Sequence, residues 1–345
     1  MRFGKSKDGF GTASPVVAEV AAVSTEPRDV VLSNTFLQSV TFPTLEEHLH
    51  AFGAALSFLR RSVSFLPEAL RIKTAIEPGY LDRLGEPYKR LPLGYLLGLG
   101  EMGGVHGDLA GQPESIRKEV CSLSAKAMAV VAVADYFVDE LGLSVPEKKE
   151  IVKSLMRTIR TGIEEPFHFE QLRRASKISA EIHCQVSQYA GSKDFFESFE
   201  NLVGVAMREI DGETGLNLAA QIGGGTVLLS GMLPRVIDPA VTRDIEEAAW
   251  NFGAFIKLVD DIRDYHHDMQ AGITTIVTAE SDPEHALVTI LERANSHLCS
   301  AYSLLGEEGI RAYDSMIYLG RLKWHIPQSV LRLARTPIST EGSEV

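Results

Sequence analysis

The feature that most constrains this chain is helical periodicity. From residue 44 onward, apolar residues recur at spacings of three and four, whereas runs that alternate apolar and polar residues are scarce. Glycine or proline interrupts the pattern at regular intervals, as expected where helices end. The pattern predicts helices near residues 44–63, 115–142, 146–162, 166–190, 194–221, 239–269, 283–305 and 308–334. We therefore predict an all-α fold.

Composition and periodicity together predict the domain organisation. The 345 residues are 45% hydrophobic and 23% charged, which is typical of a globular protein with a full core. Residues 1–42 mix Gly, Ser, Thr and Pro with little periodicity, so we expect a mobile N-terminal arm. We expect a single all-α domain over residues 43–335 and a polar tail over residues 336–345.

Charge and cysteine content argue against several classes of protein. The 34 basic and 46 acidic residues give a net charge of −12, which disfavours a nucleic-acid partner. The three cysteines lie far apart without zinc-ligand spacing. The long uncharged stretch at residues 214–234 is too rich in glycine and polar residues for a transmembrane segment, and the N-terminus lacks the apolar core of a signal peptide. We expect a cytoplasmic protein.

Two apolar segments each lead into a cluster of acidic residues. In AKAMAVVAVADYFVDELG, eight uncharged residues precede Asp135, and Asp139 follows four residues later. In WNFGAFIKLVDDIRDYHHDMQAG, Asp260 and Asp264 are likewise four apart, with Asp261 beside them. Residues four apart lie on one face of a helix, so each cluster places carboxylates about one turn apart.

Either cluster alone is equally compatible with a solvated helix face. Lys257 and Arg263 are placed to pair with the acids of the second cluster at helical spacing. The two clusters together favour a different explanation, because both follow an apolar run and both use Asp, the poorer helix former. Facing Asp carboxylates suit Mg²⁺, which takes oxygen ligands and is usually shared with phosphates. We therefore predict a diphosphate–Mg²⁺ site between the two helices.

At these residues the chain resembles the polyprenyl-synthetase-like branch of the class I isoprenoid synthase superfamily. FGAFIKLVDDIRDYHHD is similar to the family's Phe-Gln-x-x-Asp-Asp-x-x-Asp motif, with Ile256 and Lys257 in place of Phe-Gln. DYFVD is similar to the first Asp-Asp-x-x-Asp motif, with Tyr136 in its second place. The resemblance extends over about residues 80–335, and it implies a helical bundle around a central cavity.

The resemblance also implies roles for individual residues. It implies acidic catalytic residues at Asp135, Asp139, Asp260, Asp261 and Asp264, of which Asp135, Asp139, Asp260 and Asp264 are Mg²⁺ ligands. It implies about three Mg²⁺ ions per site when diphosphate is bound. Candidate diphosphate-binding residues are Lys257, Arg263, Arg208, Arg321, Lys323 and Lys89. Candidate cavity-lining residues are Tyr136, Phe137, Phe252 and Phe255.

Departures from the family pattern bear on the reaction. The stretch EPYKRLPLGYLLGLG keeps Lys89 but lacks the glycines and final Arg of the segment that holds isopentenyl diphosphate, and Glu213 and Thr214 stand where the family has Lys-Thr. These losses favour a terpene synthase or cyclase that acts on one allylic prenyl diphosphate. The alternatives are a prenyltransferase using isopentenyl diphosphate or another acceptor, and a non-catalytic partner subunit. A homodimer is compatible with each.

One further motif is not explained by this chemistry. Gly223, Gly224 and Gly225 lack the preceding strand and the following Lys-Ser/Thr of a phosphate-binding loop. Within a helix, consecutive glycines are expected at a kink, or where a ligand lies beside the backbone.

Overall fold

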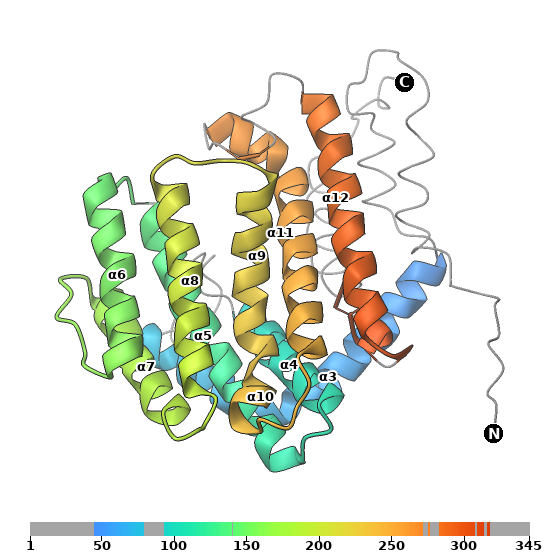
Figure 1. Cartoon of the computed structure of the whole chain (residues 1–345), viewed down its shortest axis with the longest axis horizontal. Helices are drawn as coiled ribbons and strands as arrows, with labels where there is room; N and C mark the ends of the chain where they lie inside the picture. Colours follow the sequence, from blue (N-terminus) through green and yellow to red (C-terminus); the bar gives the residue numbers. More distant parts are fainter. Residues whose placement is uncertain are drawn as a thin grey trace, which may run out of the picture. The chain divides into compact units, whose positions relative to one another are not determined.

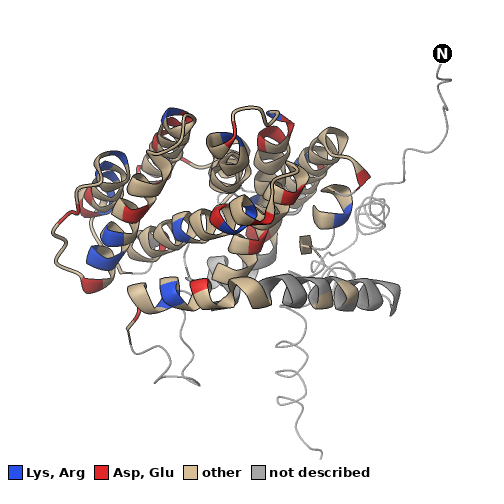
Figure 2. Cartoon of the chain, turned by 90° about the horizontal axis from the view of Figure 1, so that it is seen from below, with Lys and Arg blue, Asp and Glu red and all other residues tan. Residues whose placement is uncertain are grey.

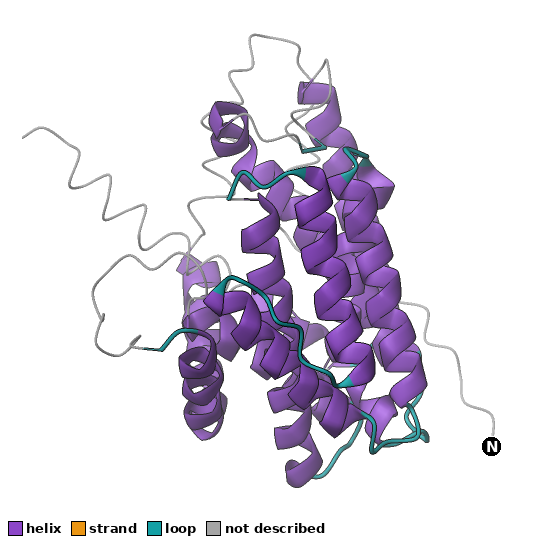
Figure 3. Ribbon diagram, turned by 90° about the vertical axis from the view of Figure 1, so that its left-hand side faces the viewer, coloured by secondary structure: helices purple, strands orange, loops and turns teal. Residues whose placement is uncertain are grey.

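The computed structural model describes residues 45–78, 93–139, 141–271, 275–276, 283–307, 309–313 and 316–317. This part is helical and contains no strand, so the predicted all-α class is confirmed (Figure 1, Figure 3). The helices are α3 (Leu45–Ile76), α4 (Leu93–Leu109), α5 (Glu114–Asp139), α6 (Val145–Thr161), α7 (Glu170–Val186), α8 (Ser192–Ile210), α9 (Leu216–Gly231), α10 (Leu233–Ile237), α11 (Asp244–Ala271) and α12 (Pro283–Leu304).

The chain comprises two compact units. Residues 58–311 form one unit, and residues 1–57 together with 312–345 form the other. The expected N-terminal arm and polar tail lie outside the described residues. Everything that follows concerns the unit formed by residues 58–311.

Several helices differ in extent from the sequence prediction, among them α3, which continues to Ile76, and α7, which is shorter at both ends. Two of the differences have identifiable reasons. The single helix expected over residues 194–221 is two helices, because Gly212 and Gly215 adopt φ values of +86° and +133° and break the chain between α8 and α9. Helix α4 was not predicted. Its sequence, LGYLLGLGEMGGVHGDL, is apolar on all sides and therefore lacks the amphipathic pattern by which helices are recognised.

Helix α5 forms the centre of the core. Its residues 123–130 are all buried, and it packs against α4, α6, α7, α9 and α10. Among the described residues, Glu114–Val138 is the one segment long and apolar enough to cross a membrane. Because 67% of its most apolar window is buried inside the bundle, it has the character of a core helix.

Helices α5 and α11 run in the same direction, with α9 antiparallel to both. Ser124, near the start of α5, donates a hydrogen bond of 3.0 Å to Ser230 at the end of α9. The end of α9 also meets the start of α11, where Gly231 faces Ala249, while Gly223 in the middle of α9 faces Lys257. It follows that the carboxyl ends of α5 and α11, which carry the two acidic motifs, lie at the same end of the bundle.

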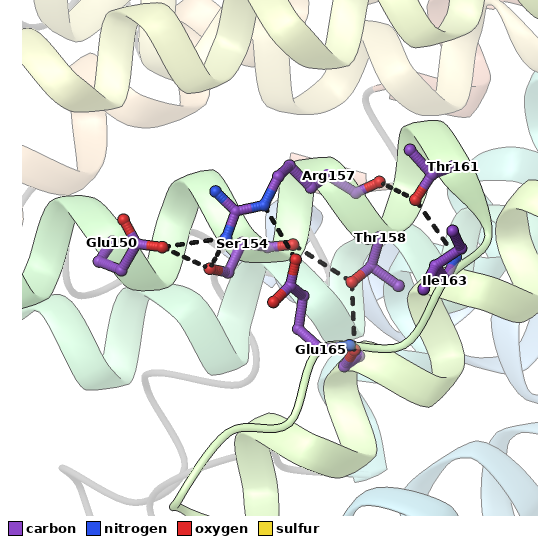
Figure 4. A network of polar contacts seen from close by, with 8 residues as sticks. Glu150, Ser154, Arg157, Thr158, Thr161, Ile163 and Glu165 are labelled. Carbon is purple, nitrogen blue, oxygen red and sulfur yellow. Dashed lines mark hydrogen bonds and ion pairs between the residues drawn. The ribbon is translucent and has the colours of Figure 1, made fainter.

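An extended return segment, residues 162–169, makes α6 and α7 parallel neighbours. Gly162 ends α6 with φ of +71°, and the chain then runs back along the helix before α7 begins. A polar network fastens the segment (Figure 4): Arg157 binds Glu165 at 2.9 Å, and the Glu165 N–H donates to the buried Ser176 hydroxyl at 2.8 Å. Ser176 also bonds Thr158 at 3.1 Å. The segment thereby brings the start of α7 beside the end of α5.

Candidate functional site

The first residues of the two acidic motifs lie at about the same level of the bundle. Ser124 and Ala249 both contact the last turn of α9, which places them at one height. Asp135 and Asp260 each follow eleven residues later on parallel helices, a rise of about 16 Å. The structure therefore brings both motifs to one end of the bundle, near the amino terminus of α9.

The first motif occupies the last turn of α5. Asp135 is exposed, and the neighbouring Tyr136 is half-buried. Asp139 is the final residue of the helix, but its side chain lies outside the described part. An exposed carboxylate at this position is accessible to a cation from solvent.

The second motif contains an ion pair within α11. Lys257 Nζ lies 2.9 Å from Asp261 Oδ1, one helical turn away. Asp261 is only 6% exposed, whereas Asp260 is half-buried. Burial alone would lower the pKa of Lys257, but Asp261, together with Glu209 of α8 and Asp260, raises it above its usual value. The ammonium group therefore carries its charge at neutral pH.

The acidic side chains of this region are of the kind that binds a hard divalent cation. Asp135 of α5 and Asp260 of α11 carry carboxylates, which are the ligands that Mg²⁺ prefers. No group of three His, Cys, Asp or Glu side chains converges among the residues whose side chains the structure describes. That set excludes Asp264 and Asp139, so the Mg²⁺ ligands inferred from the sequence remain a prediction.

Of the predicted basic residues, Arg208 and Lys257 have described side chains. Arg208 lies in the last turn of α8, where its Nε donates to Glu213 at 2.8 Å and its Nη1 donates to Gln221 at 3.0 Å. The hydrogen bonds and charge of Glu213 raise the pKa of Arg208. The side chain of Arg263 lies outside the described part, as do the residues Lys89, Arg321 and Lys323. Figure 2 shows acidic and basic residues interspersed along the same helices.

The predicted cavity-lining aromatic residues occupy different environments. Phe137 is 2% exposed and packs against Phe169 of α7 with ring centroids 5.1 Å apart, which makes it part of the core between α5 and α7. Tyr136 contacts the edge of the Phe137 ring. Phe252 is fully buried and stacks on the half-buried Phe255 at 6.1 Å.

One pocket within the described unit lies away from the acidic motifs. It has a volume of about 330 Å³ and is near the start of α5, at the opposite end of that helix from Asp135. Its lining residues are Ser64, Phe65, Glu68, Arg117, Lys118, Glu119, Cys121, Ser122 and Gln185. A central cavity beside the acidic motifs remains a prediction.

The consecutive glycines of α9 serve helix packing. A Cβ on Gly223 would lie 2.4 Å from both the Gly253 carbonyl oxygen and the Lys257 Cβ, and a Cβ on Gly224 would meet the Trp250 ring at 2.6 Å. The space beside Gly223 and Gly224 is therefore filled by α11, that beside Gly225 is filled by Leu202 of α8, and α9 continues through the glycines as a helix. Small residues four apart on α11, Ala249 and Gly253, are the sequence signal for this contact.

Sequence comparison identifies no relatives, since no family model and no curated protein matches the chain. Among solved structures, the chain is similar to a geranylgeranyl pyrophosphate synthetase from the archaeon Geoglobus acetivorans. The two share 13% sequence identity with a TM-score of 0.42, over 81% of this chain and 99% of that chain. At these values the likeness assigns no family to the protein.

Proposed function

We propose that the protein is a Mg²⁺-dependent enzyme that ionises an allylic prenyl diphosphate. One observation carries the proposal: Asp135 and Asp260, from motifs 125 residues apart in sequence, lie at one level on parallel helices. Structural needs alone do not require Asp at the ends of two apolar helix segments, since Glu is the better helix former. A diphosphate–metal complex bound by both motifs would account for Asp135 and for Asp260.

In this proposal Asp135 and Asp260 would hold Mg²⁺ at the diphosphate-binding site. Bound there, Mg²⁺ would supply Lewis-acid charge that stabilises the diphosphate as a leaving group. Lys257 adds a fixed positive charge beside Asp260 and Asp261. Apolar side chains then exclude water from the allylic cation that forms.

Within this class, we favour a terpene synthase that uses a single prenyl diphosphate. The segment expected to hold isopentenyl diphosphate lacks most of its characteristic residues. Glu213, which stands where the family has a Lys, is occupied by its ion pair with Arg208. The retained Lys89 supports the second candidate, a prenyltransferase that uses isopentenyl diphosphate.

The test is turnover by the purified protein and its Asp260→Asn variant. Each is incubated with Mg²⁺ and geranyl, farnesyl or geranylgeranyl diphosphate, with and without isopentenyl diphosphate, and released diphosphate and products are measured by mass spectrometry. Asp260→Asn should lower turnover about 100-fold or more while leaving the helical circular dichroism spectrum unchanged. The control is Asp194→Asn. Asp194 lies in the first turn of α8 and forms an ion pair with Arg235, so this variant should retain activity.

The products separate the candidates. A hydrocarbon or alcohol from one substrate indicates a terpene synthase, whereas a longer diphosphate formed only with isopentenyl diphosphate indicates a prenyltransferase. Equal turnover in wild type and Asp260→Asn would contradict the site. Absence of turnover with all three substrates would contradict both the terpene synthase and the prenyltransferase that uses isopentenyl diphosphate, which leaves a prenyltransferase with another acceptor or a partner subunit.

A further inference from the structure

The ion pair between Lys257 and Asp261 has a consequence for metal binding that the acidic motif alone does not suggest. Asp261 is 6% exposed, and a carboxylate this deeply buried requires a compensating positive charge. Lys257 provides that charge at 2.9 Å from the next turn of the same helix. The carboxylate is thus neutralised by the protein itself.

The packing of α9 holds Lys257 in place. The Cβ of Lys257 lies where a side chain on Gly223 would otherwise be, 2.4 Å from the position of the missing Cβ. The Cβ of Lys257 therefore packs against the α9 backbone, and the lysine side chain is only 31% exposed. A side chain shielded from solvent to this extent keeps its ammonium in a lower effective dielectric, which strengthens its attraction to Asp261.

The surrounding charge keeps Lys257 protonated. Glu209 reaches the same region from the end of α8, and Asp260 flanks the pair on α11. Their negative charges add to that of Asp261 and favour the ammonium form. A divalent ion bound to Asp261 would have to lie close to this ammonium and would be repelled by it.

We infer that Lys257 is a positioning residue that acts as a built-in cation: its ammonium takes the place of a divalent ion at Asp261, so that the acidic cluster binds one metal ion fewer than its carboxylates would otherwise hold. This inference rests on the proposed function. At the second motif, Asp260 then binds the metal ion. Asp261 is not a ligand, and its role is to hold the Lys257 ammonium in place.

The test counts metal ions on the full-length protein. Mn²⁺ bound per chain is measured by electron paramagnetic resonance in the presence of inorganic pyrophosphate. Lys257→Gln should bind one more Mn²⁺ per chain than wild type, and Lys257→Arg, which keeps the charge, should bind the same number as wild type. The matched control is Lys193→Gln at the start of α8. Lys193 is exposed and forms an ion pair with Glu197, four residues later, which is the same spacing as between Lys257 and Asp261.

A second variant makes the result independent of how well Lys257→Gln folds. Asp261→Asn should bind as many Mn²⁺ ions as wild type, because Asp261 is not a ligand. Loss of an ion in Asp261→Asn, or equal counts in Lys257→Gln and wild type, would overturn the inference and leave the proposed function intact. If wild type binds no Mn²⁺ with pyrophosphate, the proposed function itself fails.

Discussion

The close contact between α9 and α11 yields the most direct test of the structure. Replacing Gly253 with alanine adds a Cβ that would lie 2.2 Å from the Gly223 carbonyl oxygen and 2.7 Å from the Val227 Cβ. Non-bonded heavy atoms normally stay about 3.5 Å apart, so the two helices must separate by about 1 Å. The obstructing oxygen belongs to the backbone and cannot rotate away as a side chain would.

The magnitude follows from two opposing effects. Overpacking of this kind costs about 1–3 kcal/mol, while alanine gains about 1 kcal/mol over glycine as a helix former. Because the obstructing oxygen belongs to the backbone, we take the upper end of the overpacking cost, and Gly253→Ala should lower the free energy of unfolding by about 2 kcal/mol. At about 2–4 °C per kcal/mol for a unit of this size, the Tm should fall by about 4–8 °C.

The assay is urea and thermal unfolding followed by far-ultraviolet circular dichroism. Gly204→Ala is the matched control, because this residue lies inside α8 and a Cβ there would meet nothing within 4 Å. The control should gain about 0.5–1 kcal/mol from helix propensity alone. If Gly253→Ala is stabilised to the same extent as the control, α9 and α11 do not pack through their glycines and the reasoning is refuted.

Two further predictions concern buried polar contacts. Ser176→Ala removes a fully buried hydroxyl that holds the return segment, so it should destabilise the fold by about 1–3 kcal/mol in urea unfolding; an unchanged midpoint would argue against the network. His106 is buried, with its Nδ1 3.1 Å from the Ser230 hydroxyl, and burial, although opposed by a hydrogen bond with the Ser230 backbone, lowers its pKa from 6.5 to about 4. The unfolded chain therefore takes up the proton first, and about 3 kcal/mol of stability is lost as pH falls from about 6.5 to 4. Comparing unfolding at pH 7 and 4.5, His106→Gln should lose less stability than wild type, and an identical pH dependence would contradict the assignment.

Several elements of this fold could be predicted from the sequence because their signals are local. Amphipathic spacing between glycine and proline breaks identified α6 and α12 to within one residue at each end, since a helix with one apolar face encodes its own period. The acidic motifs were likewise placed correctly at the end of α5 and within α11. Helix α4 was not predicted, because a helix that is apolar on all sides shows no alternation of apolar and polar residues with the helical period.

What the sequence determined by itself was the helical class and the position of each acidic motif along its helix, because both depend on residues within a few turns of one another. Only the tertiary structure decided what surrounds those residues. It assigned Gly223 and Gly224 of α9 to packing against α11 and Phe137 to the core beside Phe169, and it put Asp135 and Asp260 at about the same level of the bundle. The physical reason is that the neighbour filling a space, or sharing a level, comes from a helix remote in sequence, and no local pattern encodes that choice.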